Sequence, residues 1–191
     1  MSCLDQFTIR HTRERRRLPS GRVIDLPARI LRLPANKPPK LPVEAHYFEQ
    51  PDRPIPASYT VKPLVTVDGR PAFGELAIRH CLEADRDGWD GVWVDTYHSR
   101  GNTRLFWRDL PDRSHPVDLT QYPQAYQAYC RILDRNKGGG GFFDVLAWKS
   151  DRVIFIEYKG NGDGPNKNEA RWIDAALAEG FDAGSLSFAL Y

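Results

Sequence analysis

The chain has no uninterrupted apolar run near the ~18 residues that a membrane-spanning helix needs. Its first residues also lack an apolar stretch of signal-peptide length. We therefore expect neither a membrane span nor a secretory leader. Cysteine is scarce: Cys3, Cys81 and Cys130 are the only three, and they have no zinc-knuckle spacing. This odd, small number argues against a disulfide framework and favours a reducing cytoplasm.

Other absences narrow the chemistry. The five histidines lack the spacing of metal ligands, so we expect each to be structural or exposed. The glycine run at residues 138–141 is not followed by the Gly-Lys-Ser/Thr of a phosphate-binding P-loop. We interpret it as a place where the chain or a nucleic-acid backbone approaches closely. No Ser/His/Asp set suggests a serine hydrolase.

Positive charge is concentrated at the N-terminus. Residues 1–40 contain ten lysines and arginines against three acids, although the formal net charge of the whole chain is only +2. A basic arm on an acidic body can contact nucleic-acid phosphates, and Arg15, Arg16 and Arg17 are the candidates. A solvated tail is the alternative that this charge pattern leaves open.

Residues 34–63 contain eight prolines, a density that excludes a regular helix or a central strand. The pair Asp68-Gly69 then signals a turn, after which the pattern becomes that of a folded core. We therefore expect a basic, proline-rich extension at residues 1–70 and a folded domain at residues 71–191.

Within this domain the patterns predict alternating helices and strands. The expected elements are a helix at 74–88, a strand at 92–98 with a partner at 105–109, an inserted helix at 122–136, a hairpin at 142–160, a helix at 167–179 and a strand from 185. Without the insertion the order is α-β-β-β-α-β, which predicts a mixed α/β fold.

The predicted hairpin, FFDVLAWKSDRVIFIEYKG, is apolar except for a few charged residues. A two-residue turn at Ser150-Asp151 places Asp144 directly opposite Glu157, with Cβ atoms roughly 4.5–5.5 Å apart. Lys159 lies two residues further along, on the same face. Opposed carboxylates destabilise a sheet unless a charge neutralises them, and oxygen ligands of this kind suit Mg²⁺ or Mn²⁺.

A solvated surface cluster is the alternative for these three charges. The second strand, however, is apolar on both faces at residues 153–156, which is typical of a strand covered by helices on both sides. Charges at the end of such a strand are costly to place without a purpose, and this favours a site.

The charged residues of this hairpin resemble the signature of a known family. Asp144 followed by Glu157-Tyr158-Lys159 resembles the D…(D/E)xK signature of the PD-(D/E)xK nuclease superfamily, and the element order is that of its core. Residues 156–177, IEYKGNGDGPNKNEARWIDAAL, are similar to the VRR-NUC group. The resemblance covers about residues 138–190, is weaker over 74–109 and is absent from the first 70. It implies a restriction-endonuclease-like fold, a mixed sheet flanked by helices.

The resemblance also implies roles. Asp144, Glu157 and the carbonyl of Tyr158 would be metal ligands, and Lys159 would orient or help deprotonate the attacking water. Glu75 matches the glutamate that many members carry on the first helix. It shares a helix stripe with residues 78 and 82, which aims it at the sheet, although an acid is also favourable in a first helical turn.

One position departs from the group. Glu169 stands where relatives usually have glutamine, and Asn166-x-x-Glu169 also fits a helix capping box. A structural cap and a site role are both open for Glu169. Nearby, Lys167 and Arg171 are candidates for phosphate contacts, with a solvated face as the alternative.

The sequence thus predicts a Mg²⁺- or Mn²⁺-dependent nuclease that hydrolyses phosphodiester bonds of DNA, with RNA as an open alternative substrate. Structure-specific cleavage and roles in DNA repair or defence are left open. A nuclease-fold module that binds or scaffolds nucleic acid without cutting is the second hypothesis, and a structural Mg²⁺ or Ca²⁺ site is the third. Dimers are common in the superfamily, but no residue pattern identifies an interface.

Overall fold

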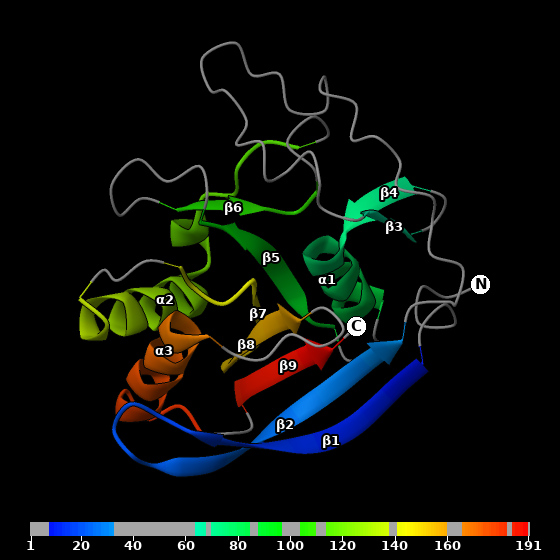
Figure 1. Cartoon of the computed structure of the whole chain (residues 1–191). Coiled ribbons are helices and arrows are strands. Elements are labelled where there is room, and N and C mark those ends of the chain that lie inside the picture. Colours follow the sequence, from blue (N-terminus) through cyan, green and yellow to red (C-terminus); the bar gives the residue numbers. More distant parts are fainter. Residues whose placement is uncertain are drawn as a thin grey trace.

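This computed structural model describes residues 8–32, 64–67, 70–84, 88–96, 104–109, 114–137, 141–159, 166–182 and 185–190 (Figure 1). Most of the strands form one seven-stranded sheet in the order β1-β2-β9-β8-β7-β5-β6, and β3 pairs with β4 separately. The strands are β1 Thr8–Arg17, β2 Val23–Arg32, β3 Leu64–Val67, β4 Arg70–Phe73, β5 Asp90–Asp95, β6 Leu105–Trp107, β7 Val145–Lys149, β8 Arg152–Lys159 and β9 Leu186–Leu190. The helices are α1 Gly74–Ala84, α2 Pro123–Arg135 and α3 Lys167–Ala178, with a 3₁₀ turn at Leu119–Gln121.

The predicted α/β class is confirmed, and the elements follow the predicted order. α1, β5, β7, β8, α3 and β9 give α-β-β-β-α-β, with α2 inserted before β7. β6 pairs with β5, as expected. Because β8 runs antiparallel to β7 and parallel to β9, the sheet is mixed. β3 and β4 pair on either side of the expected turn, whose residues 68–69 lie outside the described chain.

Helices cover both faces of the central strands (Figure 1). On one face, Ile78 and Leu82 of α1 pack in a cluster with Ile154 and Ile156 of β8. On the other face, Phe155 packs in a larger cluster that includes residues of α2 and α3. The tryptophans at positions 89, 93, 107, 148 and 172 are all buried, as core aromatics should be. β8 is therefore apolar on both faces because both faces are covered.

The central hairpin has the predicted register. Pairs run from Val145↔Ile156 to Lys149↔Arg152, so the two turn residues are Ser150 and Asp151. Ser150 takes φ +50°, the positive value that a tight hairpin turn requires. β7 therefore begins, and β8 ends, at the open end of the hairpin, where Asp144 and Glu157 lie.

Residues 8–32 form a β-hairpin that the sequence did not predict. β1 and β2 are ten residues each, and β2 runs parallel to β9, with Ala28 opposite Phe188. Leu18 and Ile24 are buried in the main core. This part of the basic arm is therefore a ribbon joined to the sheet and not a solvated tail. The proline-rich residues 34–63 lie outside the described chain.

No helix in the described ranges combines the length and the apolar character that a membrane crossing needs.

Candidate active site

Asp144 lies immediately before β7 and is held at the end of β8. The backbone N–H of Tyr158 donates to Asp144 Oδ2 at 2.8 Å, and the carbonyl of Asp144 accepts from the N–H of Val94 at 2.8 Å. The pairing of Val145 with Ile156, continued by one position, brings Asp144 opposite Glu157. The predicted juxtaposition of these two carboxylates is therefore present. The ligand role of the Tyr158 carbonyl stays a prediction.

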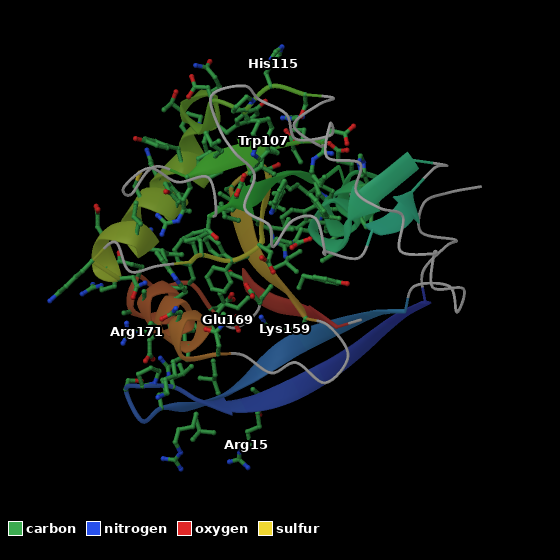
Figure 2. All side chains as sticks on the ribbon, turned by 45° about the horizontal axis from the view of Figure 1, so that its top comes forward. Arg15, Trp107, His115, Lys159, Glu169 and Arg171 are labelled. Carbon is green, nitrogen blue, oxygen red and sulfur yellow. The ribbon has the colours of Figure 1, made fainter. Side chains whose placement is uncertain are left out.

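Lys159 sits between two glutamates. Its Nζ lies 2.7 Å from Glu157 Oε1 and 2.6 Å from Glu169 Oε1. We call these three residues the Lys159 cluster, and all three are buried, at 5% to 8% exposure. Figure 2 shows Lys159 and Glu169 side by side where α3 begins. The cluster holds two carboxylates and one ammonium, so its formal charge is −1 when all three groups are ionised.

One oxygen of Glu157 is unsatisfied. Among the described residues, Glu157 Oε2 has no hydrogen-bond partner, although it is buried. Burial first, and then the nearby Asp144 carboxylate, raise the pKa of Glu157 well above its ordinary value. Buried polar atoms are nearly always paired, so an orphaned carboxylate oxygen needs an explanation. A divalent cation between Asp144 and Glu157 would satisfy this oxygen and lower the repulsion, so the residues fit such an ion.

The side chains offer a small ligand set. In the described part of the chain, no three His, Cys, Asp or Glu side chains group together as a metal site. The candidate set is therefore two carboxylates, with backbone carbonyls or water to complete the coordination. Sites of this kind suit Mg²⁺, which commonly uses one or two carboxylates and keeps several waters.

Lys159 remains charged. Burial alone would lower its pKa, but Glu157 and Glu169 outweigh burial and raise the pKa of Lys159 to about 12. The ammonium therefore donates hydrogen bonds at neutral pH and does not accept a proton. Of its three N–H donors, two are directed to the glutamates.

Glu169 forms the helix cap that the sequence offered, and it also contacts Lys159, while its site role stays a prediction. The Asn166 side chain accepts from the backbone N–H groups of residues 168 and 169, and Glu169 Oε2 accepts from the backbone N–H of Asn166 at 2.8 Å. This is a capping box. The other oxygen, Oε1, accepts from Lys159. One carboxylate thus starts α3 and holds Lys159.

Glu75 is buried, at 3% exposure, in the first turn of α1. The start of α1 lies close to the end of β8. A Cβ atom added to Gly74 would lie only 2.5 Å from the Tyr158 ring, which shows how close the two segments are. The expectation that Glu75 points inward is confirmed. α1 covers the face of β8 that carries Ile156, opposite to that of Glu157, and the catalytic role of Glu75 stays a prediction.

Sequence reasoning missed three buried polar residues, Arg79, Asp95 and Arg104. Asp95 is fully buried at the end of β5, where it accepts from Trp107 Nε1 at 3.3 Å. Like Asp144, it is an acid at one end of an apolar strand, and this signal could have found it. Arg104 donates to the Gly141 carbonyl at 2.7 Å and lies 5.3 Å from the Trp172 ring. No local pattern marks Arg104, because its partners come from distant segments.

The candidate phosphate-binding residues lie on two separate surfaces. On β1, Arg16 pairs with Ile24, which is buried in the core beside α3, so the exposed Arg15 and Arg17 lie on the opposite face of the ribbon. Lys167 and Arg171 are exposed on α3. Figure 2 shows Arg15 beneath the ribbon and Arg171 beside α3. These cations therefore do not form one patch.

Comparison with known proteins adds no relative. No model of a known protein family matches the chain, and neither the curated proteins nor the solved structures include a similar one. The function of the chain is therefore inferred from its own residues and their geometry.

Proposed function

We propose that this protein is a Mg²⁺- or Mn²⁺-dependent nuclease that hydrolyses phosphodiester bonds of DNA, with its reaction centre at Asp144, Glu157 and Lys159. The observation that carries the proposal is the buried, unpaired Oε2 of Glu157 beside a second carboxylate. The resemblance of these residues to the D…(D/E)xK signature and the α-β-β-β-α-β order support it. The PD-(D/E)xK nuclease fold is part of the proposal.

Asp144, Glu157 and the Tyr158 carbonyl would hold the cation. When bound, Mg²⁺ supplies Lewis-acid polarisation of a phosphate and acidifies a water molecule. Asp144 is kept in place for this task by the N–H of Tyr158. The chain's own contribution is therefore a pair of carboxylates fixed by a hairpin register.

Lys159 provides positive charge and a donor where negative charge develops on the phosphate. Two of its N–H groups are directed to glutamates, which leaves one for the attacking water or a phosphate oxygen. Stabilisation of this kind by a fixed donor is worth most in a buried site. Glu169 is a positioning residue, because it acts through Lys159.

The alternative is a module that binds nucleic acid without cutting it. One observation favours it: Lys159 is held by two carboxylates, and such an ion cluster can join β8 to α3 without any chemistry. A purely structural cluster, however, leaves Glu157 Oε2 unexplained. We therefore place the nuclease first.

The test is incubation of the purified protein with supercoiled, linear, single-stranded and branched DNA, with and without Mg²⁺. We expect Mg²⁺-dependent cleavage that falls by about 10²–10³-fold in Asp144→Asn and in Glu157→Gln. The matched control is Asp151→Asn, which changes an exposed carboxylate at the far end of the same hairpin.

Cleavage that survives both substitutions would remove the assigned site. A wild-type protein that retards DNA on a gel and never cuts any of the four substrates would favour the binding module. The Asp151→Asn control must cleave as fast as wild type, so that a loss in Asp144→Asn or Glu157→Gln can be assigned to the site.

A further inference from the structure

A groove of about 500 Å³ lies away from the reaction centre, between the tip of the β1–β2 ribbon, the end of α2 and the outer side of α3. Three arginines line it, Arg22, Arg135 and Arg171, one from each element. We propose that this groove binds the phosphodiester backbone of duplex nucleic acid. The inference rests on the proposed function only for the choice of nucleic acid as the ligand.

The fold builds the walls of this groove. The Asp174 carboxylate of α3 accepts from the N–H of Ser20 at 2.9 Å and from its hydroxyl at 2.7 Å. The ribbon tip is also closed by its own backbone, since the N–H of Leu18 donates to the Arg22 carbonyl at 2.8 Å. Leu18 is buried in the core, which anchors the tip from below. Arg22 is therefore held beside α3 by the ribbon and not by a free loop.

The groove carries a surplus of positive charge. Arg22 and Arg171 are exposed, and within the described residues neither has a carboxylate partner. Arg135 lies 2.7 Å from Glu179, but that one carboxylate also pairs with Arg131, so two cations share it. Asp174 contributes a carboxylate to the groove lining, and this carboxylate accepts two hydrogen bonds from Ser20. Guanidinium groups bind phosphate through paired donors, so an anionic ligand of this chemistry fits.

The spread of the cations favours a polymer over a single ion. Lys167 is exposed one helical turn before Arg171, which extends the positive row by about 6 Å along α3 towards its first residue. From Lys167 to Ala178 at the far end of the groove, α3 advances about 16 Å. Successive phosphates of one strand advance about 3.4 Å along a duplex, so this row matches several of them.

The groove is distinct from the reaction centre. Residues two positions apart on a helix point about 200° away from each other, so Arg171 and Glu169 lie on opposite sides of α3. Figure 2 shows Glu169 next to Lys159 and Arg171 on the outer side of the helix. The groove would therefore hold the backbone away from the bond that is cut, and it would contribute affinity without taking part in chemistry.

The test is binding of a short fluorescent DNA duplex to the full chain in EDTA, followed by anisotropy over a series of salt concentrations. We expect Arg22→Ser and Arg171→Ser each to weaken binding severalfold and to lower the salt slope by about 1. The matched control is Arg152→Ser, an exposed arginine that lies in the turn region of the β7–β8 hairpin. It removes the same charge and should leave the slope unchanged.

Equal effects of Arg171→Ser and Arg152→Ser would overturn the groove, because general attraction to charge would then explain binding. The groove also fails if inorganic phosphate displaces the duplex at matched phosphate concentration, since the site would then take a free anion. The measurement needs no cleavage: groove-dependent binding without any cutting refutes the proposed function alone. Cutting with unchanged salt slopes refutes the groove alone.

Discussion

Lys159 Nζ lies 2.6 Å from Glu169 Oε1, which ties the end of β8 to the first turn of α3. The same glutamate closes the capping box with Asn166. A residue that starts a helix therefore also fixes the proposed catalytic lysine. Conservative and truncating substitutions should separate these two contributions.

We predict that Glu169→Gln loses less Mg²⁺-dependent cleavage than Glu169→Ala, because its single amide oxygen can keep one of the two contacts, to Lys159 or to the N–H of Asn166. Glu169→Ala removes both contacts, so it should lower the free energy of unfolding by about 1 kcal/mol or more and reduce cleavage further. Urea unfolding and cleavage rates measure the two effects. If Gln and Ala variants lose the same activity, the charge of Glu169 matters and the hydrogen bonds do not.

The second prediction concerns pH and the stability of the metal-free protein. Burial and Asp144 raise the folded-state pKa of Glu157 above its ordinary 4.5. At pH values between the pKa of Glu157 in the unfolded chain and its higher pKa in the folded chain, the folded chain holds more protons. Glu157 therefore makes the free energy of unfolding fall as pH rises. We expect the Tm of Glu157→Gln to decline less than that of wild type between pH of about 5 and about 8.

Added Mg²⁺ should raise the wild-type Tm in this range, because it favours the ionised glutamate, and it should not do so in Glu157→Gln. Glu179→Gln serves as a control of opposite sign at pH below the ordinary glutamate value of 4.5. Arg135 and Arg131 lower the pKa of Glu179, so its contribution is present above its unfolded pKa and is lost as pH falls. A Glu157→Gln variant with the pH dependence and Mg²⁺ response of wild type would contradict the assignment.

The third prediction compares two arginines that each lie 5.3 Å from a tryptophan ring. Arg104 is buried over Trp172 and donates to the Gly141 carbonyl, whereas Arg152 is exposed over Trp89. Arg104→Met should lower the free energy of unfolding by about 2–3 kcal/mol, because it leaves a carbonyl unpaired and removes a desolvated ring contact. Arg152→Met should cost under about 1 kcal/mol. Equal costs in urea unfolding would show that burial of Arg104 adds nothing.

The fourth prediction tests the outer face of the ribbon. Deleting residues 8–32 would remove two strands and the buried Leu18 and Ile24, so charge must be tested by substitution. We expect the double variant Arg15→Ser, Arg17→Ser to lower the salt slope of DNA binding by about 2 while the fold is kept. Circular dichroism checks the fold. An unchanged slope would show that these exposed arginines are merely solvated.

Local rules were sufficient for the central hairpin. A two-residue turn and strict alternation determine the register, so the placement of Asp144 opposite Glu157 follows from the sequence alone. The helix that carries Glu169 was also predictable from its cap and its apolar stripe. These features depend on residues that are close together in the chain.

The β1–β2 ribbon could not be predicted in the same way. Its first strand reads TIRHTRERRR, a charged run that resembles a solvated arm. It becomes a strand because β2 pairs with β9, a partner at the other end of the chain. Arg104 is a similar case, since its contacts come from residues 129, 141 and 172. Long-range partners of this kind leave no mark in a local pattern.

The parallel pairing of β2 with β9 has a consequence for folding. During translation β2 is made long before β9, and the contact of Ser20 with Asp174 joins residues 154 positions apart. Bringing such distant residues together costs chain entropy before their contacts can stabilise the fold. Folding is slower for this reason. Until β9 is made, the arginine-rich edge strand β1 would keep the β1–β2 hairpin from pairing with other chains, because charge on an edge strand opposes aggregation. The same arginines would then protect the nascent protein from aggregation.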